Sequence, residues 1–301
     1  MQTPTQETIT NLLNQVQSDS HEIQHKALQT FSYITKVSLP NRNLVAETEG
    51  AIGIFLNAAK SASASAKMLA LSVLFNLSLN PNLRQTLANM ETIEHLNTII
   101  LTRSSPESMR LAASLICSLA MLDKNKAQFG VAGTVQALVE ALSVARCPAA
   151  HHLVSSLAEL AQFHGNCTLA VRAGAIPVLF NVVESSDGED IAGSALVILG
   201  LLARFDQGLE ALRMRDGVVP LLVDVLKRRC MLSKEGSAEV LLRLFDYSEE
   251  CAEEAAQMPE FSSLVADLSV WGSGRAREKA DMLMRKMTEV TWEGNPAVPE
   301  W

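Results

Sequence analysis

The stretch RAGAIPVLF, residues 172–180, returns 43 residues later as RDGVVPLLV, residues 215–223. Both copies place a glycine two residues after an arginine, then two apolar residues, a proline and three more apolar residues. Glycine suits the left-handed backbone that ends a helix, and a proline in the first turn of the next helix loses no hydrogen bond. The phrase therefore predicts a boundary between two helices, and this structural role explains it without a binding function.

Weaker copies of the same phrase occur along the whole chain at nearly constant intervals. Counting the two clear copies as well, the glycine of the phrase, or the residue in its place, lies at positions 50, 91, 133, 174, 217 and 260. These positions are 41 to 43 residues apart. A stretch rich in leucine and alanine precedes each copy, with apolar residues spaced i, i+3, i+4 and i+7 as on one face of a helix. Two independent anchors with one period indicate a helical repeat of the armadillo or HEAT type.

The sequence therefore predicts an all-α protein, a right-handed armadillo solenoid of about six repeats with a C-terminal capping helix. Each repeat is expected to hold a long leucine-rich helix, a short helix that ends at the glycine, and a middle helix. Asparagines in the links LNPN and LDKN are expected to cap the short helices. We expect the repeat domain to span residues 9–288, with a disordered N-terminus over 1–8 and a disordered tail over 289–301.

Composition and charge exclude several classes of function. The net charge of −8 argues against nucleic acid as a partner. No apolar run reaches the roughly 18 residues of a membrane span, and the polar N-terminus does not resemble a signal peptide. Five scattered cysteines without a C-x-x-C pair predict reduced thiols and a cytoplasmic or nuclear location.

Catalytic and metal-binding patterns are also missing from the sequence. No Ser-His-Asp order, nucleophile elbow, phosphate loop or pair of catalytic carboxylates stands out, so we expect neither enzyme activity nor a cofactor. A metal site could be built only from His151, His152, His164 and Cys167. Adjacent histidines point about 100° apart on a helix, so we expect no metal there.

Several segments carry a resemblance to a known family. They are VLFNLSLNPN (73–82), LICSLAMLDKNKAQFGVAGTVQALVEAL (115–142) and FHGNCTLAVRAGAIPVL (163–179), with WGSGRAREKADMLMRKM (271–287) similar to a closing helix. In this style the chain from about residue 18 to 288 resembles the armadillo-repeat region of plant U-box ubiquitin ligases. The sequence has no Cys-Pro-Ile segment of a U-box ahead of the repeats. The resemblance therefore implies the partner-binding half of such a protein rather than ligase activity.

The long helices of an armadillo solenoid line its concave face, where elongated partners usually lie. Two rows on these helices form the predicted groove, polar in the N-terminal half and apolar in the C-terminal half, with the alternative that the apolar residues belong to the core. The predicted groove residues are Tyr33, Ser72, Asn76, Ser114, Ser118, Ser155, Glu159, Val197 and Leu201, with Val240 and Leu244 continuing the rows.

These features favour a non-catalytic scaffold that binds a partner protein along its concave face. The family resemblance implies a ubiquitination-related or receptor-kinase setting, with a receptor-like kinase or a ubiquitination substrate as partner. The alternative is the substrate-recognition part of a U-box ligase. A nuclear import adaptor is disfavoured, because the rows lack the tryptophans of those proteins and keep one asparagine, Asn76. The oligomeric state is left open.

Overall fold

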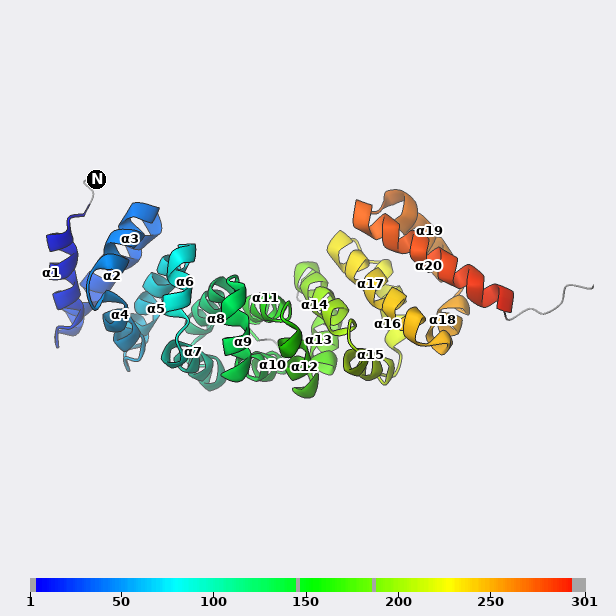
Figure 1. Ribbon diagram of the computed structural model, residues 1–301, viewed down its shortest axis with the longest axis horizontal. Coiled ribbons are helices and arrows are strands. Elements are labelled where there is room, and N and C mark those ends of the chain that lie inside the picture. The colour runs from blue at the N-terminus through cyan, green and yellow to red at the C-terminus, as the bar shows by residue number, and fades with distance from the viewer. Residues whose placement is uncertain (1–3, 145–146, 186–187, 294–301) are drawn as a thin grey trace, which may run out of the picture. The chain divides into compact units, whose positions relative to one another are not determined.

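A computed structural model describes residues 4–144, 147–185 and 188–293, and every regular element in them is helical (Figure 1). The contacts divide the chain into two compact units, Met1–Asn166 and Cys167–Trp301, where the sequence predicted one repeat domain. Among the described residues no single helix is both long and apolar enough to cross a membrane. Only the helix pair α12 (His164–Arg172) and α13 (Ala175–Glu184) reaches that length and composition, across a bend of 82°.

The first unit consists of short helices joined by tight links. Its elements are α1 (Gln6–Val16), α2 (His21–Val37), α3 (Leu39–Glu47), α4 (Ala51–Ala59), α5 (Ala64–Ser78), η1 (Pro81–Leu83), α6 (Arg84–Leu87), α7 (Met90–Thr102), α8 (Pro106–Ala120), α9 (Asp123–Val131), α10 (Thr134–Leu142) and α11 (Ala150–Leu160).

The second unit follows the same scheme. Helix α12 (His164–Arg172) starts at the end of the first unit, and the remaining elements are α13 (Ala175–Glu184), α14 (Glu189–Leu202), α15 (Asp206–Arg213), α16 (Val218–Leu226), α17 (Met231–Tyr247), α18 (Glu249–Ala256), α19 (Phe261–Trp271) and α20 (Gly274–Glu293).

These helices form six repeats of three, which confirms the predicted armadillo architecture. Each repeat has a first helix (such as α9), a second helix (α10) and a third helix (α11), and α1 with α2 precede them as a partial repeat. The predicted capping helix, α20, is the third helix of the last repeat. In each unit, successive third helices pack against one another: α2, α5, α8 and α11 in the first, and α14, α17 and α20 in the second.

The glycine of the recurring phrase has the backbone that the sequence predicts. Gly50, Gly133, Gly174 and Gly217 have φ between 68° and 78°, and each immediately precedes a second helix. A side chain is strained in this left-handed region, which explains why glycine recurs there. In α13 and α16 the proline of the phrase is the third residue, in the first turn, as expected.

Both ends of the chain are more helical than the sequence predicts. Helix α1 begins at Gln6, because Thr5 caps it by accepting a hydrogen bond from the N–H of Thr8 at 3.3 Å. Residues 6–8, expected to be disordered, are therefore helical. Helix α20 continues to Glu293, five residues beyond the predicted domain end. The remaining parts of the two predicted disordered segments, 1–3 and 294–301, lie outside the described residues.

Buried asparagines close the link between a third helix and the next first helix. The Asn125 amide nitrogen donates to the carbonyl oxygens of Leu119 (2.9 Å) and Arg84 (3.2 Å), and the Asn166 amide makes the equivalent pair of bonds. Asn125 therefore lies inside α9 and ties two repeats together, rather than capping the helix as expected. Asn80 does cap η1, because its Oδ1 accepts from the N–H of Asn82 at 3.1 Å.

Candidate binding surface

Helices α2, α5 and α8 of the first unit pack in order and leave one face of each helix in solvent. We call this the first-unit face, and it consists of two rows of side chains that repeat every 42 residues. The rows are Tyr33, Phe75 and Cys117, and Val37, Leu79 and Met121. Four of these side chains are well exposed, from 42% at Leu79 to 59% at Val37, and Phe75 and Cys117 are half-buried.

Two of the predicted groove residues do not lie on this face. Asn76 and Ser118 are only 7% and 5% exposed, and both bind the preceding third helix. The Asn76 amide donates to the carbonyl oxygen of Ser32 and to the hydroxyl of Thr35, both at 3.1 Å. Ser118 Oγ donates to the carbonyl oxygen of Ser78 at 3.1 Å. The expectation that they are exposed is wrong, because these hydrogen bonds offset the cost of burying their polar groups.

The predicted row of serines lies at the margin of the surface, half-buried between neighbouring helices. Ser72 Oγ lies 2.9 Å from Ser32 Oγ, and Ser114 Oγ lies 3.3 Å from Nδ1 of His152. Ser155 Oγ donates to the carbonyl oxygen of His151 in its own helix at 2.8 Å. The hydroxyl groups of Ser72 and Ser114 therefore contribute to the stacking of third helices, whereas that of Ser155 bonds within its own helix. Tyr33 is the one residue of the predicted polar half that is well exposed.

Glu159 is engaged in an ion pair within the first unit. Its carboxylate lies 2.9 Å from Nζ of Lys126, a side chain only 4% exposed, and Asp123 contacts the same ammonium group at 2.8 Å. Burial lowers the pKa of Lys126, but the hydrogen bonds to Asp123 and Glu159 outweigh it, so the pKa lies above its ordinary value. A partner would compete with this pair for Glu159.

In the second unit, Val197 and Leu201 lie on the solvent-facing side of α14. Val197 is 38% exposed and Leu201 is half-buried, and both line a pocket of about 180 Å³ with residues of α17 and α20. Val240 and Leu244 instead belong to the core and are fully buried. On α17 the solvent-facing positions come one residue earlier, at the half-buried Glu239 and Arg243, again 42 residues after the α14 pair.

Of the six residues that form the first-unit face, the sequence analysis found Tyr33 and missed the other five. Counting from Tyr33 in steps of 42 leads to Phe75 and Cys117, whereas the predicted row took a first step of 43 to Asn76. The same strict interval links Val37, Leu79 and Met121. The face of the first three stacked helices is therefore apolar, the reverse of the polar half that was expected.

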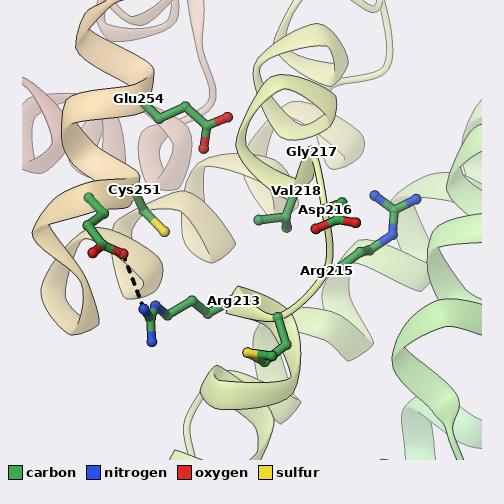
Figure 2. Close-up of a pocket in the computed structure, with 9 residues that line it drawn as sticks. Arg213, Arg215, Asp216, Gly217, Val218, Cys251 and Glu254 are labelled. Carbon is green, nitrogen blue, oxygen red and sulfur yellow. Dashed lines mark hydrogen bonds and ion pairs between the residues drawn. The ribbon is translucent and has the colours of Figure 1, made fainter.

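A second concavity lies where α15 turns into α16, beside α18 (Figure 2). It encloses about 250 Å³, and Arg213 reaches across it to Glu250 at 3.1 Å. Arg215 points to the other side, where it contacts Glu184 at 2.9 Å and lies 4.4 Å from the ring centre of Phe180. The two arginines at this pocket are therefore matched by the protein's own carboxylates.

The histidines considered as metal ligands are placed by packing. The rings of His151 and His152 meet edge to face at 5.7 Å, and His152 contacts Ser114. Burial, followed by the charges of His151 and Arg110, lowers the pKa of His152. In the part of the chain that the structure describes, no three His, Cys, Asp or Glu side chains are grouped so as to hold a metal ion.

Comparisons with known proteins agree with this architecture. The family described as the plant U-box protein ARM repeat region matches residues 8–300. The U-box domain-containing protein 8 of Arabidopsis thaliana is 29% identical over 223 residues, which are 74% of this chain and 57% of that protein. The chain thus spans little more than half of this relative and 17% of U-box domain-containing protein 1 of Medicago truncatula.

Solved structures show the same fold at low sequence identity. A designed armadillo repeat protein in complex with the peptide (KR)4 is 18% identical, with a TM-score of 0.70 over 78% of this chain and 99% of the designed one. A chain from a structure concerning the interaction between cadherin and β-catenin has a TM-score of 0.78 at 15% identity, over 96% of this chain and 55% of that one.

Proposed function

This chain belongs to the family of plant U-box protein armadillo-repeat regions, and from that membership we propose that it is a non-catalytic scaffold that binds another protein along the faces of its third helices. Third helices line the concave side of armadillo solenoids, the side on which extended partners usually lie. In this proposal the surface of the third helices, rather than a catalytic group, performs the function.

The apolar first-unit face is the single observation that carries this proposal. Six mostly apolar side chains from three packed helices and their C-terminal caps form it, including Val37, Leu79 and Met121, each more than 40% exposed. A contiguous exposed apolar surface costs solvation free energy and usually marks a contact with another macromolecule. At about 25 cal/mol per Å² of apolar area, covering such side chains contributes a substantial part of a binding free energy.

The family suggests the setting in which this scaffold works. We place it in ubiquitination-related or receptor-kinase signalling, in the cytoplasm or nucleus, with a ubiquitination substrate or a receptor-like kinase as its partner. The alternative is that it serves as the substrate-recognition region of a U-box ligase. The names of the related plant proteins favour this alternative, and the repeat surface has the same role in both cases.

The test compares two doubly substituted proteins that carry the same change of charge. Leu79→Glu with Met121→Glu alters the first-unit face. Leu101→Glu with Val131→Glu alters exposed apolar residues on a second and a first helix of the same unit, 43% and 84% exposed. Both proteins should keep the wild-type thermal unfolding midpoint, because all four positions are exposed.

Quantitative affinity purification from plant tissue should then separate the two variants. We expect the face variant to lose a specific set of partner proteins at least tenfold and the control variant to retain it. Equal retention by both variants would contradict binding at the first-unit face. Ubiquitin-chain formation by the purified chain with E1, E2 and ubiquitin alone would contradict its non-catalytic role. The identities of the lost proteins distinguish kinases from ligase substrates.

A further inference from the structure

The pocket between α14, α17 and α20 has an apolar floor. Leu196, Val197, Leu201 and Leu232 line it, and its volume is about 180 Å³. Two glycines let α14 and α17 approach closely here: a Cβ on Gly236 would lie 2.7 Å from Cβ of Leu196, and one on Gly200 would lie 3.2 Å from Cγ of Glu239. A water molecule occupies about 30 Å³ in the liquid, so the pocket can take one medium or large apolar side chain.

The carboxylates at this pocket are already matched by the protein itself. Glu239 accepts a hydrogen bond from Arg243 at 2.9 Å and lies 3.3 Å from Nζ of Lys279. Glu235 lies 3.6 Å from the same ammonium group and accepts from Ser273 Oγ at 3.0 Å. Burial raises the pKa of Glu239, but the bond from Arg243 and the charge of Lys279 hold it below its ordinary value.

Two guanidinium groups at the pocket have no such match. Arg204 and Arg275 line it and are exposed, and among the described residues neither lies within 4.0 Å of a carboxylate. The pocket beside α15 differs, because its arginines Arg213 and Arg215 are both in ion pairs, of which Figure 2 shows that of Arg213. The third-helix pocket therefore has an excess of positive charge around an apolar floor, on a chain whose net charge is −8.

We propose that this pocket binds an acidic–apolar peptide segment of a partner protein. One apolar side chain enters the space above Val197, Leu201 and Leu232, and flanking carboxylates pair with Arg204 and Arg275. Arginine favours this role because its planar guanidinium binds a carboxylate through two parallel hydrogen bonds. The inference rests on the proposed scaffold function and specifies the chemistry of one partner segment.

Fluorescence anisotropy with three labelled peptides tests the inference on the full chain. The probe is Ser-Glu-Asp-Phe-Glu-Asp-Ser. One control replaces Phe with Ser, and the other is the basic peptide Ser-Lys-Arg-Phe-Arg-Lys-Ser. We expect saturable binding of the probe, at least tenfold weaker binding of the Ser control, and no saturation with the basic peptide. Tighter binding of the basic peptide, or no saturation by the probe at millimolar concentration, would overturn the assignment.

Two charge-matched variants locate the contact. Arg204→Gln with Arg275→Gln should weaken probe binding at least tenfold, because both guanidinium groups that pair with the carboxylates of the probe are removed. Arg277→Gln with Arg285→Gln removes the same charge from exposed positions of α20 that do not line the pocket, and should change binding less than twofold. All four substitutions are at exposed side chains, so an unchanged unfolding midpoint is expected. Equal weakening by both variants would show a non-specific charge effect and refute the site.

The outcome is independent of the test of the proposed function. If the acidic–apolar probe fails to bind while the variant of Leu79 and Met121 still loses its partners, the pocket assignment is wrong and the scaffold function stands. If the probe binds but no partner depends on Leu79 and Met121, the first-unit face is wrong and the pocket remains.

Discussion

Replacing Asn125 by alanine should destabilise the first unit by about 2–3 kcal/mol. Its amide nitrogen makes two hydrogen bonds to carbonyl oxygens, at 2.9 and 3.2 Å, and the residue is only 2% exposed. Each bond contributes about 1 kcal/mol net, and alanine also leaves these carbonyls without that donor in a buried place. Asn125→Asp should cost more than alanine at neutral pH, because a carboxylate oxygen would face two carbonyl oxygens.

Equivalent asparagines of neighbouring repeats give an internal scale for this prediction. Asn41 is buried but donates to one carbonyl, that of Ile34 at 3.1 Å, so Asn41→Ala should cost about 1 kcal/mol. Asn82 is exposed, so Asn82→Ala should change the free energy of unfolding by less than about 0.5 kcal/mol. Urea titration followed by circular dichroism at 222 nm measures all of them, with the slope m checked for constancy. A smaller loss for Asn125→Ala than for Asn41→Ala would refute the reasoning.

Three further predictions follow from single contacts. Gly208→Ala should lower the free energy of unfolding by at least about 2 kcal/mol, since its Cβ would lie 2.0 Å from a carbonyl oxygen. Gly53→Ala, on the open face of α4, should raise the free energy of unfolding by about 0.5–1 kcal/mol. The urea midpoints of the two variants check both expectations. Because the pKa of Lys126 is raised in the folded state, its stabilising effect is complete below pH 10.5 and is lost as the pH rises through the folded-state pKa. The difference in free energy of unfolding between wild type and Lys126→Met should therefore shrink in alkaline solution. A difference that does not depend on pH would contradict this. Burial raises the pKa of Cys167 to about 11, so at pH 8 only about a thousandth of it is thiolate and iodoacetamide should modify it far more slowly than the half-buried Cys147, as peptide mass spectrometry would show.

The repeat architecture was predictable because its anchors are strict local requirements. A left-handed backbone favours glycine, as at Gly174, and the first turn of a helix accepts proline, as at Pro177, so both residue types recur in the sequence at the helix boundaries. Leucines at helical spacing then give the order of helices. The division into two units left no such signature, because the glycine phrase recurs on both sides of it, at Gly133 and Gly174.

The candidate binding surface was harder to predict, because there an apolar residue faces solvent and its polar neighbour is buried. On α5 the apolar Phe75 faces solvent and the polar Asn76 is buried. Hydrophobicity alone predicts the reverse burial of these two residues. It takes no account of the acceptors that Ser32 and Thr35 of the neighbouring helix offer to the Asn76 amide. On α17 the shift had another origin. Helix α16 before it has nine residues where α13 has ten, so α17 starts one residue sooner after its glycine than α14 does, and counting from the glycine phrase placed the row one residue too far along.

Solvent-facing and buried residues are direct neighbours in the third helices, as at Phe75 and Asn76, and this limits how proteins of this kind can change length. One residue inserted into a third helix would rotate everything beyond it by about 100° and exchange the solvent-facing row with the row that bonds the neighbouring repeat. Insertions and deletions should therefore be tolerated in the links and rejected within α5 or α8. Substitutions at Leu79 or Met121, in contrast, alter the chemistry of the first-unit face while leaving the stacking contacts intact. The binding preference proposed for this face can thus diverge by point substitution without a matching change in the scaffold.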